Sequence, residues 1–231
     1  MQEIYKQPIK EELILKRIQE IKKSGGIAAV SGTPLAAIKY KDLVKESEAD
    51  LFFLQATVVS TEHLGKEGSQ NLDLFDLCKN IGMPVAVGNC VTYEVSLKLM
   101  RAGAAAVMVG IGPGAACTSR GVLGVGIPQA TAISDCASAR DAFQKESGKY
   151  VPIIADGGII TGGDICKCLA CGADSVMIGS PIARSQEAPG KGFHWGMATP
   201  SPVLPRGTRI KVGTTGSLKS ILCGPAILDD G

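Results

Sequence analysis

The sequence alternates short apolar runs with longer amphipathic or alanine-rich stretches. Each run is bounded by glycine, asparagine or aspartate. The runs are IAAVSG (27–32), DLFFLQA (50–56), PVAVGN (84–89), AAVMVG (105–110), PIIADGG (152–158) and SVMIGS (175–180). Continuous apolar runs of this length are typical of parallel strands that are buried on both faces. The alternation therefore predicts an α/β fold.

The stretches around these runs are long enough to form helices. They are ELILKRIQEIKK (12–23), LDLFDLCKNIG (72–82), YEVSLKLMRAG (93–103), ATAISDCASARDAFQKE (130–146) and GGDICKCLACG (162–172). Gly103 and Gly172 each stand between a helical stretch and the next strand, which is typical of a left-handed helix cap. The chain therefore reads as repeated βα units.

Repeated βα units form either an open doubly wound sheet or a closed barrel. Polar or glycine-rich residues follow the predicted strands, where barrel enzymes carry their sites. These residues are Gln55, Asn89, Gly112 to Cys117, Asp156 and Ser180. We therefore expect residues 1–231 to form one catalytic (β/α)8 TIM barrel domain that is incomplete, with six of eight strands, because the N-terminal strands are missing. The first and last strands would then have unpaired edges.

The composition of the chain excludes two classes of partner, nucleic acid and membranes. The 24 basic and 22 acidic residues are spread along the chain, and aromatic residues make up only 4%, so neither a basic stripe nor a stacking platform for nucleic acid is indicated. No apolar run approaches the roughly 20 residues that span a bilayer. Eight cysteines without a signal peptide indicate reduced thiols. We expect a soluble, cytoplasmic protein with no nucleic-acid or membrane partner.

Two segments interrupt the βα rhythm. IGPGAACTSRGVLGVG (111–126) is too long for an ordinary βα connection, and residues 181–217 contain no obvious strand or helix. Long irregular segments in compact domains are usually functional or disordered. The second segment is rich in glycine and proline and includes Arg206 and Arg209. It is compatible with a flap that folds over a ligand and, equally, with a disordered tail.

Cys117 lies among small residues in the first of these segments. Glycines there allow backbone groups to approach a ligand, and the thiol of such a loop can be an exposed nucleophile. A buried, inert cysteine in a tight turn is the alternative. The length of the loop and its position after a strand favour the nucleophile.

Two later loops suit a phosphorylated nucleoside. Asp156 ends one strand and can accept hydrogen bonds from ribose hydroxyls, while backbone N–H groups at Gly158, Gly179 and Ser180 can surround a phosphate. The alternative is that Asp156 caps a helix and the glycines only form turns.

Two other motifs are weaker. CKCLAC (166–171) resembles a metal cluster, but Cys166 and Cys168 would point about 200° apart on a helix, which disfavours convergence on one zinc ion. His63 falls in a polar stretch that we expect to be a loop, and we assign it no role.

Taken together, five segments resemble the IMP dehydrogenase and GMP reductase family, and specifically the IMP dehydrogenase-related branch that lacks CBS domains. They are VGNCVT (87–92), VGIGPGAACTSRGVLGVGIPQATA (109–132), IADGGI (154–159), GADSVMIGS (172–180) and EAPG (187–190). The resemblance covers most of the chain.

The resemblance implies a role for each matching residue. The family's nucleophilic cysteine falls on Cys117, and Ser119 stands at its catalytic threonine. Asp156 matches the acid on the nucleotide ribose, and Asn89 an active-site asparagine. Gly158, Gly179 and Ser180 match the phosphate contacts. Arg206 and Arg209 both match the flap arginine that activates water, and Arg206 is the preferred of the two.

The cofactors implied by the resemblance are NAD and a potassium ion. The potassium ligands would be carbonyls of Gly112, Gly114 and Cys117, and Gly110 and Gly112 would lie on the NAD side. Three positions depart from the family pattern. Gln55 replaces an aspartate that binds the nicotinamide ribose, Met108 replaces an arginine, and Ala115 replaces a phosphate-binding serine.

The function implied is NAD-dependent oxidation of IMP to XMP through a covalent Cys117 intermediate. The family is tetrameric, so the resemblance also implies a homo-oligomer. A GMP reductase using NADPH is the alternative within the family. A purine-nucleotide-binding protein without turnover is the alternative from another class, motivated by Gln55, Met108 and Ala115.

Overall fold

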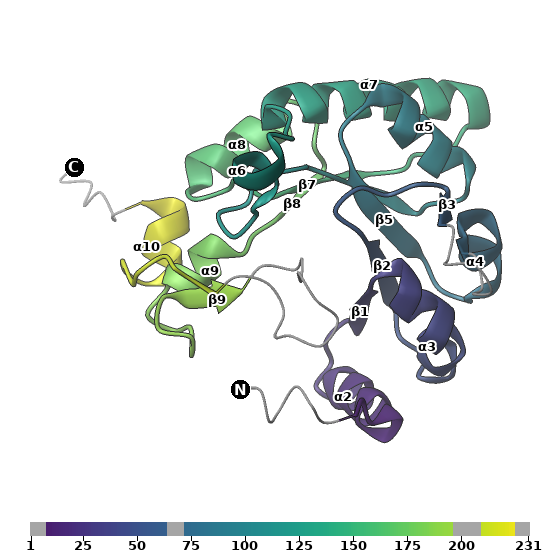
Figure 1. Cartoon of the computed structure of the whole chain (residues 1–231), viewed down its shortest axis with the longest axis horizontal. Helices are drawn as coiled ribbons and strands as arrows, with labels where there is room; N and C mark the ends of the chain where they lie inside the picture. The colour runs from purple at the N-terminus through teal and green to yellow at the C-terminus, as the bar shows by residue number, and fades with distance from the viewer. Residues whose placement is uncertain (1–7, 64–71, 196–208, 225–231) are drawn as a thin grey trace, which may run out of the picture. The chain divides into compact units, whose positions relative to one another are not determined.

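The structure is a computed structural model that describes residues 8–63, 72–195 and 209–224. The chain divides into two compact units. We call residues 8–109 and 135–153 the N-terminal unit, and residues 110–134 and 154–224 the C-terminal unit. Both contain parallel strands followed by helices, which confirms the predicted α/β class (Figure 1).

A parallel sheet forms the centre of the N-terminal unit. Its strands are β1 (Ala29–Gly32), β2 (Leu51–Gln55), β5 (Val85–Cys90) and β6 (Ala106–Val109), paired in that order. Every residue of β5 and β6 is buried. Four of the predicted apolar runs are therefore confirmed as strands. The continuous apolar sequence of β5 and β6 fits their burial, because a strand covered on both faces needs apolar side chains on both.

The helices of this unit include three that follow a strand and begin at a residue whose side chain accepts a backbone N–H group, Thr33, Asp73 or Thr92. The helices are α2 (Glu11–Lys23), α3 (Pro34–Glu46), α4 (Leu74–Asn80), α5 (Tyr93–Arg101) and most of α7 (Gln129–Ser147). The Thr33 hydroxyl accepts the Ala36 N–H at 3.3 Å, which satisfies one of the free donors at the start of α3. Helix α3 contacts β1 and β2 (Figure 1). Gly103 after α5 has φ 97°, so the predicted left-handed cap is confirmed.

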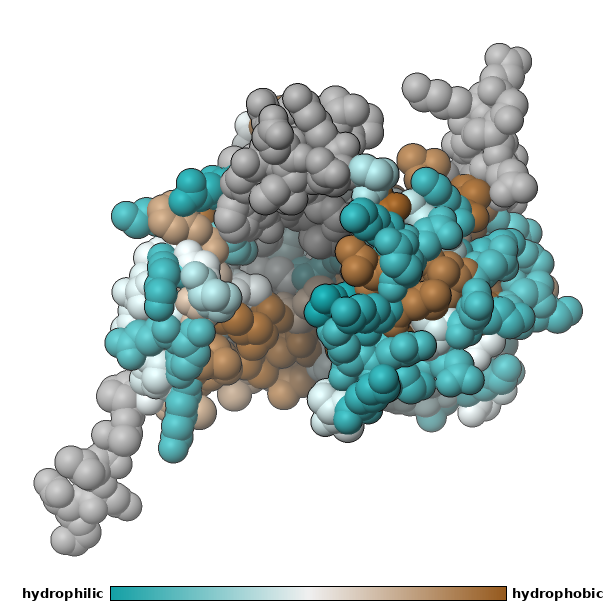
Figure 2. Space-filling model, turned by 90° about the horizontal axis from the view of Figure 1, so that it is seen from below, coloured by the Kyte–Doolittle hydropathy of each residue, from teal (hydrophilic) through white to brown (hydrophobic). Residues whose placement is uncertain are grey.

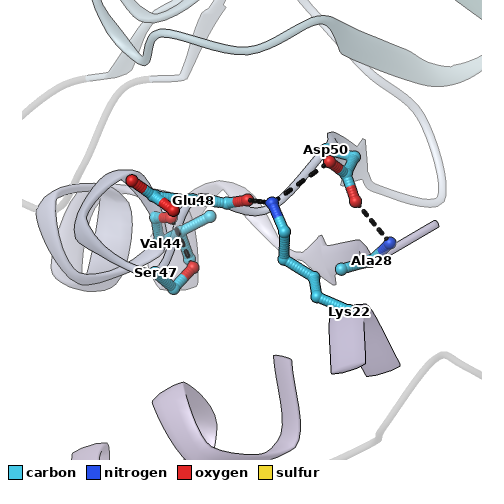
Figure 3. Close-up of polar contacts among 6 residues, drawn as sticks. All are labelled: Lys22, Ala28, Val44, Ser47, Glu48 and Asp50. Atoms are coloured by element: carbon cyan, nitrogen blue, oxygen red, sulfur yellow. Dashed lines mark hydrogen bonds and ion pairs between the residues drawn. The ribbon is translucent and has the colours of Figure 1, made fainter. Parts of the chain in front are cut away.

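A polar corner joins α2 to the starts of β1 and β2 (Figure 3). The Lys22 ammonium donates to the Glu48 carbonyl at 2.5 Å and contacts the Asp50 carboxylate at 3.3 Å. The same carboxylate accepts the Ala28 N–H at 2.8 Å. Hydrogen bonds from Ala28 and Lys22 hold the pKa of Asp50 below its ordinary value.

The first strand lies at an edge of its sheet. Among the described residues β1 pairs only with β2. Ile27 before the strand and Leu35 after it are 77% and 63% exposed. Figure 2 shows apolar side chains at the surface in separate groups. Among the described residues the predicted unpaired edge of this strand is therefore confirmed, and the exposed apolar side chains named lie beside the strand and not on it.

Sequence reasoning missed a small antiparallel pair, β3 (Glu62–His63) with β4 (Leu72–Asp73). The expectation that His63 lies in a loop is wrong, because its backbone pairs with Leu72. Strands this short leave no periodic pattern in the sequence.

The C-terminal unit contains the other two predicted strands. β7 (Ile153–Asp156) and β8 (Ser175–Met177) pair in parallel, with Asp156 opposite Met177. Helix α8 (Gly162–Ala170) connects them, and Gly172 after it has φ 107°. A Cβ on Gly162 would overlap the Leu222 carbonyl oxygen, so α10 (Leu218–Cys223) packs directly on the start of α8.

The segment after residue 181 corrects the expectation that it lacks regular structure. Helix α9 (Ser180–Arg184) enters it, and β9 (Phe193–Trp195) pairs antiparallel with β10 (Arg209–Lys211). The Arg209 guanidinium lies 4.0 Å from the centre of the Phe193 ring. Three-residue strands far apart in the chain are not visible to local periodicity. No helix in the described part of the chain is long and apolar enough to cross a bilayer.

Candidate active site

The Cys117 loop, which we define as residues 110–126, begins where β6 ends. Gly110 and Gly112 have φ of 148° and 86°, which favour glycine and turn the chain sharply. The Cys117 N–H donates to the Gly114 carbonyl at 3.0 Å and closes a tight turn. This turn presents the Cys117 side chain at the surface, where the thiol is exposed.

Ser119 lies next to the thiol at the start of α6 (Ser119–Leu123). The Cys117 thiol donates to the Ser119 hydroxyl, with 3.4 Å between Sγ and Oγ. Ser119 is itself buried. The two residues that the resemblance implies are catalytic are therefore in contact, with Cys117 exposed and Ser119 buried, and their catalytic roles stay a prediction.

The turn after β7 packs against the Cys117 loop. Gly157 and Gly158 have φ of 92° and 79°. A Cβ on Gly157 would lie 3.0 Å from Cγ of Pro113 and 3.1 Å from the Gly114 nitrogen, and one on Gly158 would lie 3.1 Å from Cβ of Pro113. Glycine is needed at both positions for this approach. The structure thus brings together the two loops that sequence reasoning singled out separately.

Gly110 joins the same arrangement from the other side. A Cβ there would overlap the Asp156 carbonyl oxygen, and the Gln129 amide donates to that same oxygen at 3.3 Å. Gly110 therefore has a packing role at the end of β7, and its contact with NAD stays a prediction. Gln129 was missed, because nothing in the sequence shows that the first residue of α7 reaches a carbonyl on β7.

Gly179 and Ser180 follow β8, the strand that pairs with β7. The carboxyl ends of paired parallel strands lie at the same edge, so these residues and Asp156 belong to one edge of the unit. Nothing lies within 4 Å of a Cβ built on Gly179, which leaves its backbone accessible. Contact of Gly179 and Ser180 with a phosphate stays a prediction.

Asp164 holds the chain that leaves this turn. Its carboxylate accepts the backbone N–H groups of Ile160 and Thr161, each at 3.0 Å, and pairs with the Lys167 ammonium at 2.7 Å. The ion pair with Lys167, followed by these two hydrogen bonds, holds the pKa of Asp164 well below its ordinary value. Residues 160–164 are thereby fixed as the start of α8.

A cavity of about 180 Å³ lies behind the turn. It is lined by Gly157 and Gly158 together with the first residues of α7 and one face of α8. Neither Cys117 nor Ser180 lines it. The cavity is therefore separate from the thiol.

The cysteines of α8 occupy different sides of the helix. Cys166 is exposed and Cys168 is buried, in agreement with the predicted helical directions. Burial raises the pKa of the Cys168 thiol. All eight cysteines are free thiols, and among the described residues no group of three or more histidine, cysteine or acidic side chains is arranged to hold a metal ion.

The remaining predicted residues lie elsewhere. Asn89 is buried at the end of β5, in the N-terminal unit, so its place beside Cys117 stays a prediction. Met108 is fully buried on β6, against the space that a Cβ on Gly88 would fill. Met108 is thus part of the core of the sheet. Arg206 lies outside the described residues.

The C-terminal segment adds contacts that sequence reasoning did not find. Ser185 forms a bridge with Gly216, and the Glu187 carboxylate accepts the Leu218 N–H at 3.1 Å. Hydrogen bonds from the backbone N–H groups of Glu187 itself and of Leu218 hold the pKa of the Glu187 carboxyl below its ordinary value. The segment after β10 is thereby fastened to the segment after α9.

Comparisons with known proteins identify the family. Residues 13–198 match the model of the IMP dehydrogenase / GMP reductase domain. The chain belongs to this family. It is 38% identical, over 230 residues and 98% of its length, to a protein of Mycobacterium leprae named as an uncharacterized oxidoreductase, of which it covers 61%. It is 45% identical over 137 residues, 59% of its length, to the inosine-5'-monophosphate dehydrogenase of Helicobacter pylori, of which it covers 27%.

The family fold extends over the whole chain. An IMP dehydrogenase/GMP reductase-like protein from Corynebacterium glutamicum superposes with a TM-score of 0.83 and 38% identity, covering 100% of this chain and 60% of that protein. The incomplete TIM barrel predicted from six strands is confirmed. The chain spans about three fifths of the length of the full-coverage relatives it matches.

Proposed function

We propose that this chain belongs to an oxidoreductase that converts IMP to XMP with NAD, through a covalent bond between Cys117 and the purine. The observation that carries the proposal is the contact of the exposed Cys117 loop with the Asp156–Gly158 turn, through Pro113 and Gly114. A nucleotide held at the turn would lie against the loop that carries the thiol.

The chemistry requires a nucleophile because hydride cannot leave the aromatic C2 of the purine until that carbon is tetrahedral. The Cys117 thiol loses its proton and its sulfur bonds to C2. NAD, when bound, accepts the hydride that then leaves C2. Water adds to the resulting thioimidate carbon, the C–S bond breaks, and XMP departs with the thiol restored. One water is consumed and one proton is released per IMP oxidised.

The surrounding residues would supply binding and proton handling. Asp156 would accept hydrogen bonds from the ribose, and backbone N–H groups at Gly158, Gly179 and Ser180 would hold the phosphate. The Ser119 hydroxyl, 3.4 Å from the sulfur, can accept a hydrogen bond from the thiol and donate one to the thiolate. These assignments rest on the family resemblance and on the positions described above.

The loop is compatible with a potassium ion. Carbonyl oxygens are the ligands that such an ion takes in proteins. The Gly114 carbonyl accepts the Cys117 N–H and retains a second lone pair. Gly112, Gly114 and Cys117 would hold the ion, and its contribution would be to fix the loop.

The proposal is tested by replacing the nucleophile and a matched exposed thiol. Cys117→Ala should lower NADH production from IMP and NAD by at least about a thousandfold while leaving the Kd for IMP within a few-fold, because the nucleotide is held by other residues. Cys166→Ala, at another exposed thiol, should leave both unchanged. Mass spectrometry of the quenched reaction should locate the purine adduct on Cys117.

Other outcomes select the alternatives. Oxidation of NADPH with GMP, and no reaction with IMP and NAD, would indicate a GMP reductase. IMP binding without turnover of either pair would indicate a nucleotide-binding protein. An adduct on another cysteine would refute the assignment of Cys117.

A further inference from the structure

The Arg120 side chain runs between two glycines of the Cys117 loop. A Cβ on Gly112 would lie 2.8 Å from Cγ of Arg120, and one on Gly126 would lie 2.7 Å from Cγ and 2.5 Å from Nε. At its end, Nη2 of Arg120 donates to the Ile127 carbonyl at 2.8 Å. The arginine thus occupies space that any side chain at either glycine would need.

These contacts connect the two ends of the loop, since Gly112 precedes Cys117 and Gly126 follows it. The backbone bends around the arginine at Gly124, which has φ 66° and donates its N–H to the Arg120 carbonyl at 3.2 Å. Gly112 also approaches the far end directly, because its Cβ would lie 3.0 Å from the Val125 carbonyl oxygen. One side chain therefore contacts both segments that flank the reactive thiol.

Apolar burial contributes little to residues 117–126, whose backbone is otherwise held by hydrogen bonds within the Cys117 loop itself. Residues 120–126 are exposed, as are Cys117 and Thr118, and Ser119 is the buried exception between them. An exposed segment gains little from apolar burial, so its conformation depends on specific contacts. Arg120 supplies two of these, a backbone hydrogen bond and a close fit between glycines.

We propose that Arg120 is a positioning residue that holds the Cys117 loop in the conformation from which the thiol attacks the nucleotide. The kinetic part of this proposal rests on the proposed function, whereas the control of the loop does not. Lysine would replace it poorly, because a planar guanidinium on a shorter stem fits between the glycines and reaches the carbonyl in one fixed geometry.

The first test removes the arginine. Arg120→Met keeps most of the length without the donor. It should lower kcat with IMP and NAD by about 10- to 100-fold, since a misplacement on the order of 1 Å has effects of that size. The Kd for IMP should stay within about threefold. Arg120→Lys should lie between the two. A kcat for Arg120→Met equal to that of the unmodified, active enzyme would overturn the positioning role.

The second test needs no turnover. Gly126→Ala should clash with Arg120 and change the rate of Cys117 alkylation by iodoacetamide by about threefold or more, relative to the exposed thiols of Cys166 and Cys223. In an Arg120→Ala background the clash is absent, so Gly126→Ala should then have no effect. Gly121→Ala is the matched control, because nothing lies within 4 Å of its Cβ position.

The two tests separate the failures. An equal effect of Gly126→Ala in both backgrounds overturns the proposal, whether or not the protein turns over IMP. If Gly126→Ala changes the rate of Cys117 alkylation only when Arg120 is present, and the protein does not turn over IMP, the proposed function is rejected. Arg120 is then still supported as the residue that places Cys117.

Discussion

Replacement of Gly110 by alanine tests the contact between the Cys117 loop and the end of β7. The new Cβ would overlap the Asp156 carbonyl oxygen, and the backbone at Gly110 has φ 148°. Forcing an atom into a packed site costs about 1–3 kcal/mol. A non-glycine residue at such a φ costs a further 1–3 kcal/mol, roughly. The expected loss, about 2–6 kcal/mol, is a large part of the 5–15 kcal/mol that typically stabilises a folded domain.

The assay is urea unfolding followed by circular dichroism, with IMP binding measured by titration calorimetry. Gly110→Ala should lower the unfolding midpoint and abolish IMP binding, because the Asp156–Gly158 turn is displaced. Gly148→Ala is the control. Gly148 has φ 73° and nothing within 4 Å of its Cβ position, so only about 1–2 kcal/mol of backbone strain is expected. Equal midpoints and equal IMP affinities for the two variants would refute the reasoning.

Two further predictions concern carboxylates whose pKa is lowered on folding. Asp164→Ala should lower the free energy of unfolding at neutral pH by about 1 kcal/mol, as loss of other helix caps does. The pKa of Asp164 is lower in the folded than in the unfolded protein, so the charged carboxylate stabilises the fold above the unfolded pKa of about 3.9. The difference between the two proteins should therefore disappear as the pH falls below that value. Urea midpoints at two pH values would show it, and a difference that grows in acid would contradict it. Asp50→Asn should weaken the contacts to Ala28 and Lys22 and so lower the melting temperature relative to the unmodified protein. This difference in melting temperature should shrink as the pH falls through the acid range. A difference that is independent of pH would show that the charge of Asp50 does not contribute.

The sequence predicted the strands better than the connections. All six parallel strands fall within the predicted runs or one residue from them, because burial on both faces demands continuous apolar residues. The β9–β10 pair was not predicted, since its strands are short and far apart in the chain. Pairing over such a distance depends on the tertiary fold, which local composition does not report.

The candidate site was predicted in its reactive residues and missed in its supports. Cys117 and Asp156 stand at strand ends in glycine-rich loops, a pattern that is visible in the sequence. Arg120 and Gln129 were missed because their partners are backbone carbonyls, of Ile127 and Asp156, and a carbonyl has no sequence signature. Met108, which departs from the family pattern, proved to be a core residue.

The chain contains a single tryptophan, and the structure places it on β9 opposite Arg209. Indole emission from the unlabelled protein therefore originates at one point, the hairpin of the C-terminal unit. The described tyrosines, at positions 40, 93 and 150, all lie in the N-terminal unit. Excitation at the red edge of the band, where indole absorbs and phenol does not, thus selects the tryptophan of the C-terminal unit. Titration with a nucleotide can then be followed at the hairpin alone, without a dye or a reporter mutation.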